Sequence, residues 1–389
     1  MFFDLPTFSG GKRAPRAVVA IPAKDEAARI GACLGALAAQ MRPSGEPLPP
    51  GLFEVVLFSN NCSDGTAALA RELASALPFA LEVVEASLPP GLSHAGEARA
   101  RAMDLALARL SAAAPDATPI LLTTDADSCV GPLWIDRNLA EIDAGADVVL
   151  GRLALDEDGR RLPETLHRRG ALESEYETLL TELAAVLDPA PWNPWPHHAT
   201  VSGASIAVTA DAYRALGGAP RPPLGEDKAL VAELLRHDAR VRYSPDVEVV
   251  TSARLRGRAK GGVADTLRLR VQHPDAPCDE ALEPYRTAEL RAAARGRLRR
   301  LWRRRDRAAL AAWSAALDLP YAVARRVGSA ETVGRAWSVA EAASPRLRRE
   351  PLRPADLPRE IAAARAGLRR LSNLSTEAWQ AKEPAEILA

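Results

Sequence analysis

The stretch AVVAIPAKDE, residues 17–26, joins an uninterrupted apolar run to a polar loop. Because no polar residue alternates with the apolar ones, we expect Ala17–Ile21 to be a strand buried on both faces of a sheet. Apolar residues at helical spacing follow the loop and predict a helix from Ala27 to about Gln40. The start of the chain therefore predicts one strand–loop–helix unit.

The same unit recurs along the first 150 residues. Strand and helix then alternate, which is typical of a parallel sheet with helices on both faces. Such sheets bind ligands beyond the carboxyl ends of their strands. The further strands are predicted over Phe53–Phe58, Leu81–Val84, Pro119–Thr123 and Asp147–Gly151, and the helices over Thr66–Leu77, Ala95–Leu110 and Leu133–Ala144.

The rest of the chain alternates less regularly. We expect a helical segment over 156–190, an ordered Pro/Trp loop at Pro189–His198, and mainly helices from about Asp279 onward. Between them lie predicted strands at Val201–Val208, Val241–Tyr243 and Val247–Val250, and predicted helices at Ala210–Leu216 and Glu226–Arg236.

Composition limits the class of protein. Lys+Arg and Asp+Glu number 50 each, so no specific nucleic-acid partner is expected. The four cysteines are widely spaced and predict free thiols in a reducing cytoplasm. Neither a signal peptide nor an apolar run of about 18 residues is evident, so we expect a cytoplasmic protein, with attachment to the inner membrane surface left open.

Two acidic pairs are candidate chemical groups. Asp125 and Asp127 follow an apolar strand as a DxD motif, and carboxylates so placed can hold Mg²⁺ or Mn²⁺; a solvated turn is the alternative. Glu226 and Asp227 precede a helix, where one carboxylate could act as a general base; a helix cap is the alternative. A base and a cation site on facing loops are what displacement at a sugar carbon requires.

Several motifs, in order, resemble those of family 2 glycosyltransferases of the GT-A fold. Order and spacing agree over about residues 17–255. The matching segments are Ile21–Glu26 ("IPAxNE"), Asn60–Ala67 ("D/N-N-x-S-x-D-G-T"), Gly96–Met103 ("GxAxARN"), Asp125–Ser128 (DxD), Val201–Ala204, Gly217-Gly218 and Gly225–Asp227 (the "ED" element).

The resemblance implies a nucleotide-sugar donor, UDP- or GDP-linked, a divalent cation (Mg²⁺ or Mn²⁺) and inversion at the anomeric carbon. Asp127 would be the main metal contact, Asp125 would face the metal or the ribose, and Asp227 would be the base, with Glu226 beside it. The nucleotide would be bordered by Pro22, Ala23, Glu26, Asn60, Asp64, Arg101 and Asp125. Since many members carry aspartate where this chain has Asn60, the nucleotide is left open.

Two further sets of residues could contact the donor or the acceptor. Arg254 and Arg258 could close over the diphosphate, with a solvated basic loop as the alternative. Trp192 and Trp195 could stack on an acceptor sugar, or pin a loop over the core.

Arginines are dense over residues 291–307, with Leu and Trp between them. Such a helix could contact an anionic membrane, bind nucleic acid, or pack its Leu face on the catalytic domain with its arginines solvated.

We therefore predict an α/β protein of the GT-A type, with a Rossmann-like, mostly parallel central sheet flanked by helices and a helical C-terminal extension. Its catalytic domain would span 1–275, with a nucleotide-binding half at about 17–150 and an acceptor half at about 151–275, and 276–389 would be the Arg/Ala-rich extension. The predicted activity is transfer of a sugar to an unidentified acceptor. A sugar-phosphate nucleotidyltransferase and a non-catalytic nucleotide-sugar or nucleic-acid binding protein are the alternatives.

Overall fold

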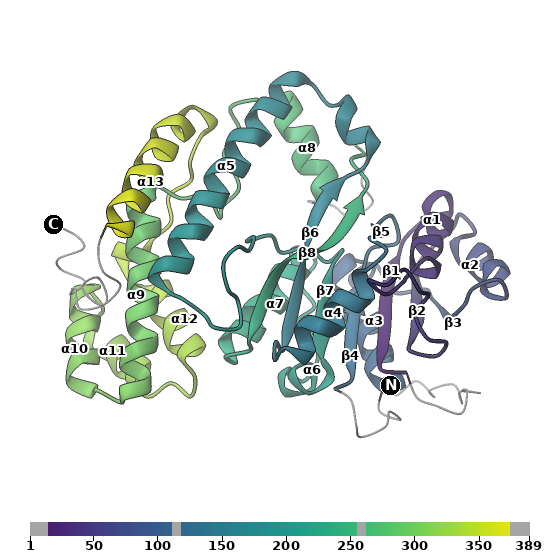
Figure 1. Cartoon of the computed structure of the whole chain (residues 1–389), viewed down its shortest axis with the longest axis horizontal. Helices are drawn as coiled ribbons and strands as arrows, with labels where there is room; N and C mark the ends of the chain where they lie inside the picture. Colours follow the sequence, from purple (N-terminus) through teal and green to yellow (C-terminus); the bar gives the residue numbers. More distant parts are fainter. Residues whose placement is uncertain (1–14, 111–117, 255–261, 374–389) are drawn as a thin grey trace.

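A computed structural model describes residues 15–110, 118–254 and 262–373 (Figure 1). Its centre is an eight-stranded sheet in the order β3-β2-β1-β4-β7-β6-β8-β5. The strands are β1 (Ala17–Ala23), β2 (Phe53–Asn60), β3 (Ala80–Ala86), β4 (Ile120–Thr123), β5 (Cys129–Val130), β6 (Val148–Leu155), β7 (Ile206–Thr209) and β8 (Val241–Thr251).

The first four strands, β1 to β4, are parallel, as the alternation of strands and helices predicts. β1 pairs in parallel with both β2 and β4, and β2 pairs in parallel with β3. Their carboxyl ends therefore share one edge, which brings together the loops that follow β1, β2 and β4. β7 is antiparallel to β4 and β6, whereas β6 and β8 are parallel.

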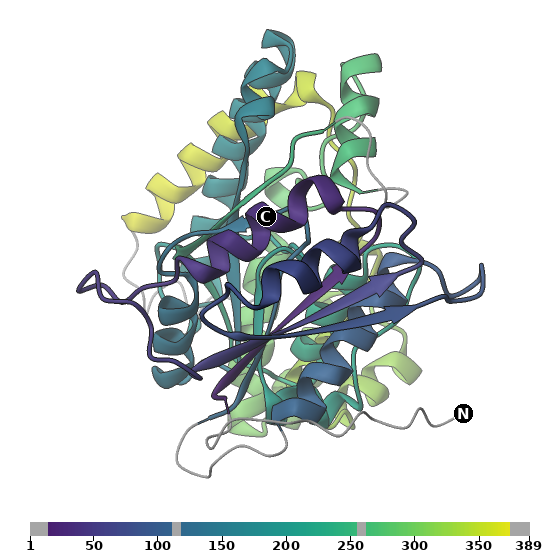
Figure 2. The same cartoon turned by 90° about the vertical axis from the view of Figure 1, so that its right-hand side faces the viewer.

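Helices cover both faces of the sheet (Figure 2). Successive residues of β1 point to opposite faces and enter two cores, with Val19 in one and Val18 in the other. Both side chains are fully buried, which accounts for the unbroken apolar sequence of this strand. One face carries α1 (Ala27–Ala38), α2 (Thr66–Ala74) and α4 (Trp134–Asp143), and the other α3 (Ala95–Leu110), α6 (Ala210–Leu216) and α7 (Glu226–Arg236).

A helical body lies beside the sheet (Figure 1). The long helix α5 (Glu164–Leu187) packs against α9 (Tyr285–Arg304) and α13 (Leu357–Ser372) around a third core. A fourth core joins α9 to α10 (Arg307–Ala316), α11 (Tyr321–Gly328) and α12 (Val333–Ala343). Within the described ranges, each helix is too short or too polar to cross a membrane.

Some elements differ from those expected. Residues 241–251 form one strand instead of two, because the proline at 245 lies where the register with β6 shifts after Gly151, so that a bulge replaces a break. The strand expected from Val201 begins only at Ile206. The helix α8 (Val263–Gln272) and the short strand β5 were not predicted.

Candidate active site

The loop after β4 carries Asp125 and Asp127 at the shared carboxyl edge. Asp125 Oδ1 accepts a hydrogen bond of 2.6 Å from Arg99 Nη2, and Asp127 Oδ2 lies 3.0 Å from Arg254 Nη2. Arg99 comes from α3, and Arg254 follows the last strand, β8. Each aspartate of the DxD motif is thus paired with an arginine from a different part of the chain.

The Glu226-Asp227 pair begins α7 and approaches the same place. Glu226 Oε1 lies 3.1 Å from Arg99 Nε, so one guanidinium bridges Glu226 and Asp125. Asp227 Oδ2 accepts a 3.0 Å hydrogen bond from the amide of Gly203, whose carbonyl accepts one of 2.9 Å from Arg99 Nη1. The structure therefore brings the two acidic pairs to one site, although a hundred residues separate them in the sequence.

Arg254, which follows β8, links the cluster to Glu26 in the loop after β1. Its guanidinium donates two hydrogen bonds to Glu26, of 2.9 and 2.5 Å, in addition to its contact with Asp127. These partners, the hydrogen bonds of Glu26 first, raise the pKa of Arg254 although burial opposes the charge. Arg258, the other predicted arginine, lies outside the described residues.

The surroundings of Asp127 disfavour the ionised form of its carboxyl group. Burial, and then the negative charge of Asp125, raise its pKa from 3.8 to about 6, although Arg254 acts in the opposite direction. A carboxylate in this position favours a nearby positive charge, whether from an arginine or from a bound cation.

The DxD pair fits a hard divalent cation. Asp125 and Asp127 each use one carboxylate oxygen in the ion pairs above, and within the described parts of the chain the other oxygen accepts no hydrogen bond. No His, Cys or further acidic side chain of those parts completes a compact three-ligand group with them. Mg²⁺ commonly takes one or two carboxylates and fills its remaining positions with water and substrate phosphates.

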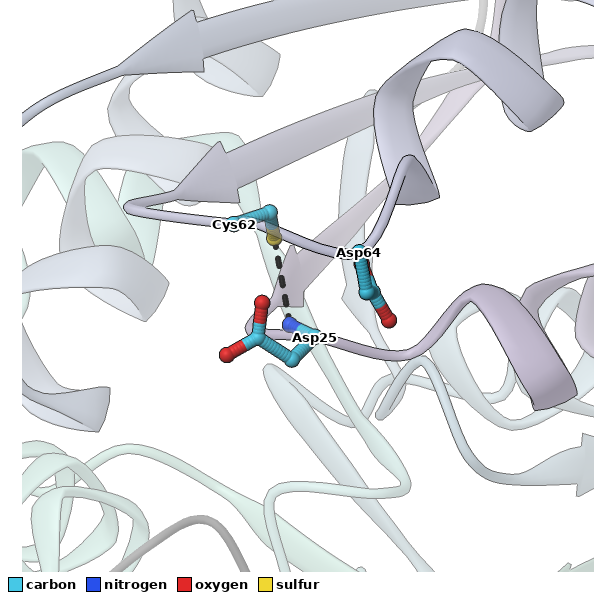
Figure 3. Close-up of side chains that lie close together, drawn as sticks. All are labelled: Asp25, Cys62 and Asp64. Carbon is cyan, nitrogen blue, oxygen red and sulfur yellow. Dashed lines mark hydrogen bonds between the residues drawn. The ribbon is translucent and has the colours of Figure 1, made fainter.

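A different compact group consists of Asp25, Cys62 and Asp64 (Figure 3), whose potential ligand atoms lie within 4.8 Å of one another. Their polar atoms already have partners. Asp25 accepts a 2.7 Å hydrogen bond from the amide of Ser63, which lowers its pKa, and its own amide donates to Cys62 Sγ at 3.2 Å. Asp64 accepts hydrogen bonds of 2.9 and 3.1 Å from the amides of Ala27 and Thr66. This group ties the loop after β1 to the loop after β2.

Apart from Asp125, which follows β4, the residues predicted to border the nucleotide lie at the ends of β1 and β2, on the loops after them and on α3. Pro22 and Ala23 end β1, and Asn60 ends β2. Asn60 is 3% exposed, and its buried side-chain oxygen has no hydrogen-bond partner among the residues that the structure describes. Arg101 pairs with Glu97 at 2.7 Å. Of the residues predicted to border the nucleotide, Asn60 is the one whose side-chain oxygen lacks a hydrogen-bond donor among the described residues.

The Pro/Trp loop is held along the first half of β8. Asn193 Oδ1 accepts a 3.0 Å hydrogen bond from the amide of Tyr243, and the carbonyl of Pro194 accepts one of 2.9 Å from Arg242. Trp195 is 41% exposed and meets the ring of His197 edge-on. Trp192 is half-buried. An acceptor role for the two tryptophans stays a prediction.

The arginines of α9 are less exposed than the sequence suggests. Arg291 pairs with Glu283 and Glu341, and Arg295 and Arg299 both pair with Asp188, whose side chain is 2% exposed. The Leu face of the helix lies in the fourth core. Within the described residues, the arginines of this region that have no ion-pair partner are Arg300, Arg303, Arg304, Arg305 and Arg307.

Two residues of the site, Arg99 and Gly203, were not singled out from the sequence. Arg99 is a variable position of the "GxAxARN" motif, beside the expected Arg101. A charged residue between the alanines of a helix expected to face the core was the available signal. Gly203 lies in the matching segment Val201–Ala204, but its own role depends on two backbone contacts across the site, which that match does not indicate.

Comparison with known proteins places the chain in a family. The model of the family "Glycosyltransferase like family 2" matches residues 15–299. A search of curated proteins found no match.

Solved structures include similar chains. TarS from S. aureus is 17% identical, with 73% of this chain and 43% of that chain covered and a TM-score of 0.43, so this chain spans less than half of that one. The fragment TarS 1-349 in complex with UDP-GlcNAc is 16% identical, with 84% and 90% covered and a TM-score of 0.45. The mannosyltransferase PcManGT from Pyrobaculum calidifontis, in complex with GDP-Man and Mn²⁺, is 18% identical, with 97% and 86% covered and a TM-score of 0.42.

The family match covers most of the chain and confirms both the predicted enzyme class and the α/β fold of the GT-A type. The protein therefore belongs to glycosyltransferase-like family 2.

Proposed function

We propose that this enzyme transfers a sugar from a nucleoside-diphosphate sugar to an acceptor hydroxyl by direct displacement, with inversion at the anomeric carbon. The observation that carries the proposal is the meeting of Glu26, the DxD pair and the Glu226-Asp227 pair around two arginines at one sheet edge. Carboxylates brought together at the end of a parallel sheet are suited to hold a cation and to accept a proton.

The DxD pair would hold Mg²⁺ or Mn²⁺ through its remaining oxygens, and the cation would neutralise charge on the departing diphosphate. Arg254 forms ion pairs with Asp127 and Glu26, and its guanidinium could also donate hydrogen bonds to phosphate oxygens. Its part in the reaction would be to stabilise the leaving nucleoside diphosphate.

Asp227 is the proposed general base. Its two oxygens accept hydrogen bonds of 3.0 and 2.7 Å from the amides of Gly203 and Lys228, and these bonds orient the carboxylate at the start of α7. From there it would take the proton of the acceptor hydroxyl as that oxygen attacks the anomeric carbon. Glu226 forms an ion pair with Arg99 and would help to hold the start of α7 in place.

The donor nucleotide would be read at the end of β2. The oxygen of Asn60 is buried in this structure, and once nucleotide binding exposes it, it could accept a hydrogen bond from the ring N–H of uracil or of guanine. This supports a UDP- or GDP-linked donor, and both classes are named in the solved structures described above.

We also propose that the unpaired arginines at the end of α9 contact an anionic membrane surface. This would place the enzyme at the inner face of the membrane without a spanning helix, and would suit a lipid-linked acceptor.

Release of nucleoside diphosphate from UDP- and GDP-sugars tests the proposed donor chemistry. We expect slow release that requires Mn²⁺ or Mg²⁺, and a rise in melting temperature with the matching nucleotide. At a hundredfold excess over Kd, binding stabilises a protein by about 2.7 kcal/mol. If no nucleoside diphosphate shifts the melt, with or without Mn²⁺, the donor assignment is wrong.

A further inference from the structure

We propose that Arg99 is a positioning residue, which couples the loop carrying the base to the loop carrying the DxD motif. The inference deepens the proposed function and rests on it, because the roles of the two loops are those proposed above. Arg99 itself would not touch the donor or the acceptor.

All three guanidinium nitrogens of Arg99 are engaged. Nη2 binds Asp125 at 2.6 Å and Nε binds Glu226 at 3.1 Å. Nη1 donates to Thr123 Oγ1 at 2.8 Å and to the carbonyl of Gly203 at 2.9 Å. The side chain thus joins the end of β4, the loop before β7 and the start of α7.

Gly203 connects Arg99 to Asp227, the proposed base, through its two backbone groups. Its carbonyl faces Arg99 while its amide donates to Asp227, so a single residue separates the guanidinium from the catalytic carboxylate. A Cβ atom at position 203 would lie 2.3 Å from Arg99 Nη2. A side chain at position 203 would therefore displace the guanidinium from its partners.

The chemistry of the contact favours a positioning role over plain stabilisation. Arg99 is 6% exposed, and burying a charged group carries a desolvation penalty that often equals the gain from its partners. Its partners belong to functional loops, and the planar guanidinium holds them at fixed angles, which an ammonium cannot do. Asp125 and Glu226 would repel each other without the charge between them.

The test compares Arg99→Met and Arg99→Lys with Arg109→Met. Arg109 lies on the same helix and forms a partly buried ion pair with Glu54, away from the site, so its loss reports the effect of removing a buried pair from α3. Two measurements are made on the full chain: steady-state donor hydrolysis with Mn²⁺, and hydrogen exchange of segments 201–205 and 223–230.

We expect Arg99→Met to lower kcat by about 100-fold, since small displacements of a reacting group have effects of this size. The fall in kcat should exceed the rise in KM for the donor, although KM should also rise because Arg99 bonds Asp125 of the DxD pair. The amides of segments 201–205 and 223–230 should exchange at least about tenfold faster. Arg99→Lys should recover little, and Arg109→Met should lower the melting temperature while keeping kcat and the exchange of both segments.

A parent-like kcat and parent-like exchange in Arg99→Met would overturn the inference, and so would losses that Arg109→Met reproduces. If Arg99→Met does not fold, Gly203→Ala displaces the guanidinium without removing its charge and should give the same two changes. If the parent releases no nucleotide, the proposed function fails, whereas the exchange experiment still decides whether Arg99 couples the two loops.

Discussion

At the scale of single residues, Asp127 links the electrostatics of the site to stability. Its pKa is about 6 in the folded protein and 3.8 ordinarily, so the folded state binds a proton more tightly than the unfolded chain. The stabilising contribution of that proton is complete below about pH 4 and is lost as the pH rises through about 6.

We therefore expect Asp127→Asn, which stays neutral, to be more stable than the parent above pH 6 when no metal is added. The difference should grow between pH 4 and 7.5 by up to about 3 kcal/mol, and unfolding in urea at several pH values measures it. A difference that does not change with pH would show that the raised pKa is wrong.

Asp227 offers the sharpest test of catalysis. Asp227→Asn keeps an acceptor oxygen for one of the two backbone amides and loses the base, so transfer should fall by at least about 100-fold while nucleotide binding survives. Product formation and thermal shift with nucleoside diphosphates measure the two effects.

The control is Asp211→Asn, an exposed aspartate at the start of α6, which should change neither property. If binding and transfer are lost together in Asp227→Asn, the residue serves the donor site and is not the base.

At the scale of elements, close helix packing joins the helical body together. Gly296 of α9 crosses the end of α5, where a Cβ atom would lie 2.2 Å from the carbonyl oxygen of Leu187. Gly296→Ala should therefore destabilise the protein by about 1–3 kcal/mol, measured by chemical denaturation.

Gly170→Ala is the matched control, because this exposed glycine of α5 has no neighbour within 4 Å of an added Cβ. It should stabilise the helix by up to about 1 kcal/mol. Equal effects of the two substitutions would mean that the crossing of α5 and α9 is not tight.

Most elements were predictable because the signals are local. The apolar run of β1 and the helical spacing after it depend on neighbouring residues, and both elements appear where expected. The bulge in β8 was not predictable, since it depends on how that strand pairs with β6. The proposed division at residue 275 stays a prediction, and α5, on one side of it, shares a core with α9 and α13 on the other.

At the scale of the whole molecule, charge is balanced overall but not in each region. The end of α9 lies at one end of the helical body (Figure 1), and its unpaired arginines include Arg303, Arg304 and Arg305. If they meet an anionic membrane, changing all three to Gln should weaken binding to vesicles containing phosphatidylglycerol by up to about 150-fold, at about 1 kcal/mol per charge. Vesicle co-sedimentation at two salt concentrations measures this.

A control variant changes Arg168, Arg214 and Arg365 to Gln, which removes the same charge from exposed residues that pair with carboxylates. It should bind vesicles like the parent. Binding to neutral phosphatidylcholine vesicles as strong as to anionic ones would contradict the electrostatic contact, and binding to RNA in preference to vesicles would reassign the surface.

The sequence by itself determined most of the order of strands and helices, with β5 and α8 as exceptions, and it determined the loops at the carboxyl edge of the sheet and the acidic pair that follows an apolar run. These follow from periodicity and from polar residues directly after apolar runs, which are properties of adjacent positions. Only the tertiary structure decided that Arg99 stands between the two pairs and that Arg295 of α9 is paired internally with Asp188. The partners in those contacts lie up to 127 positions apart, and which of them meet is set by packing that no local pattern records.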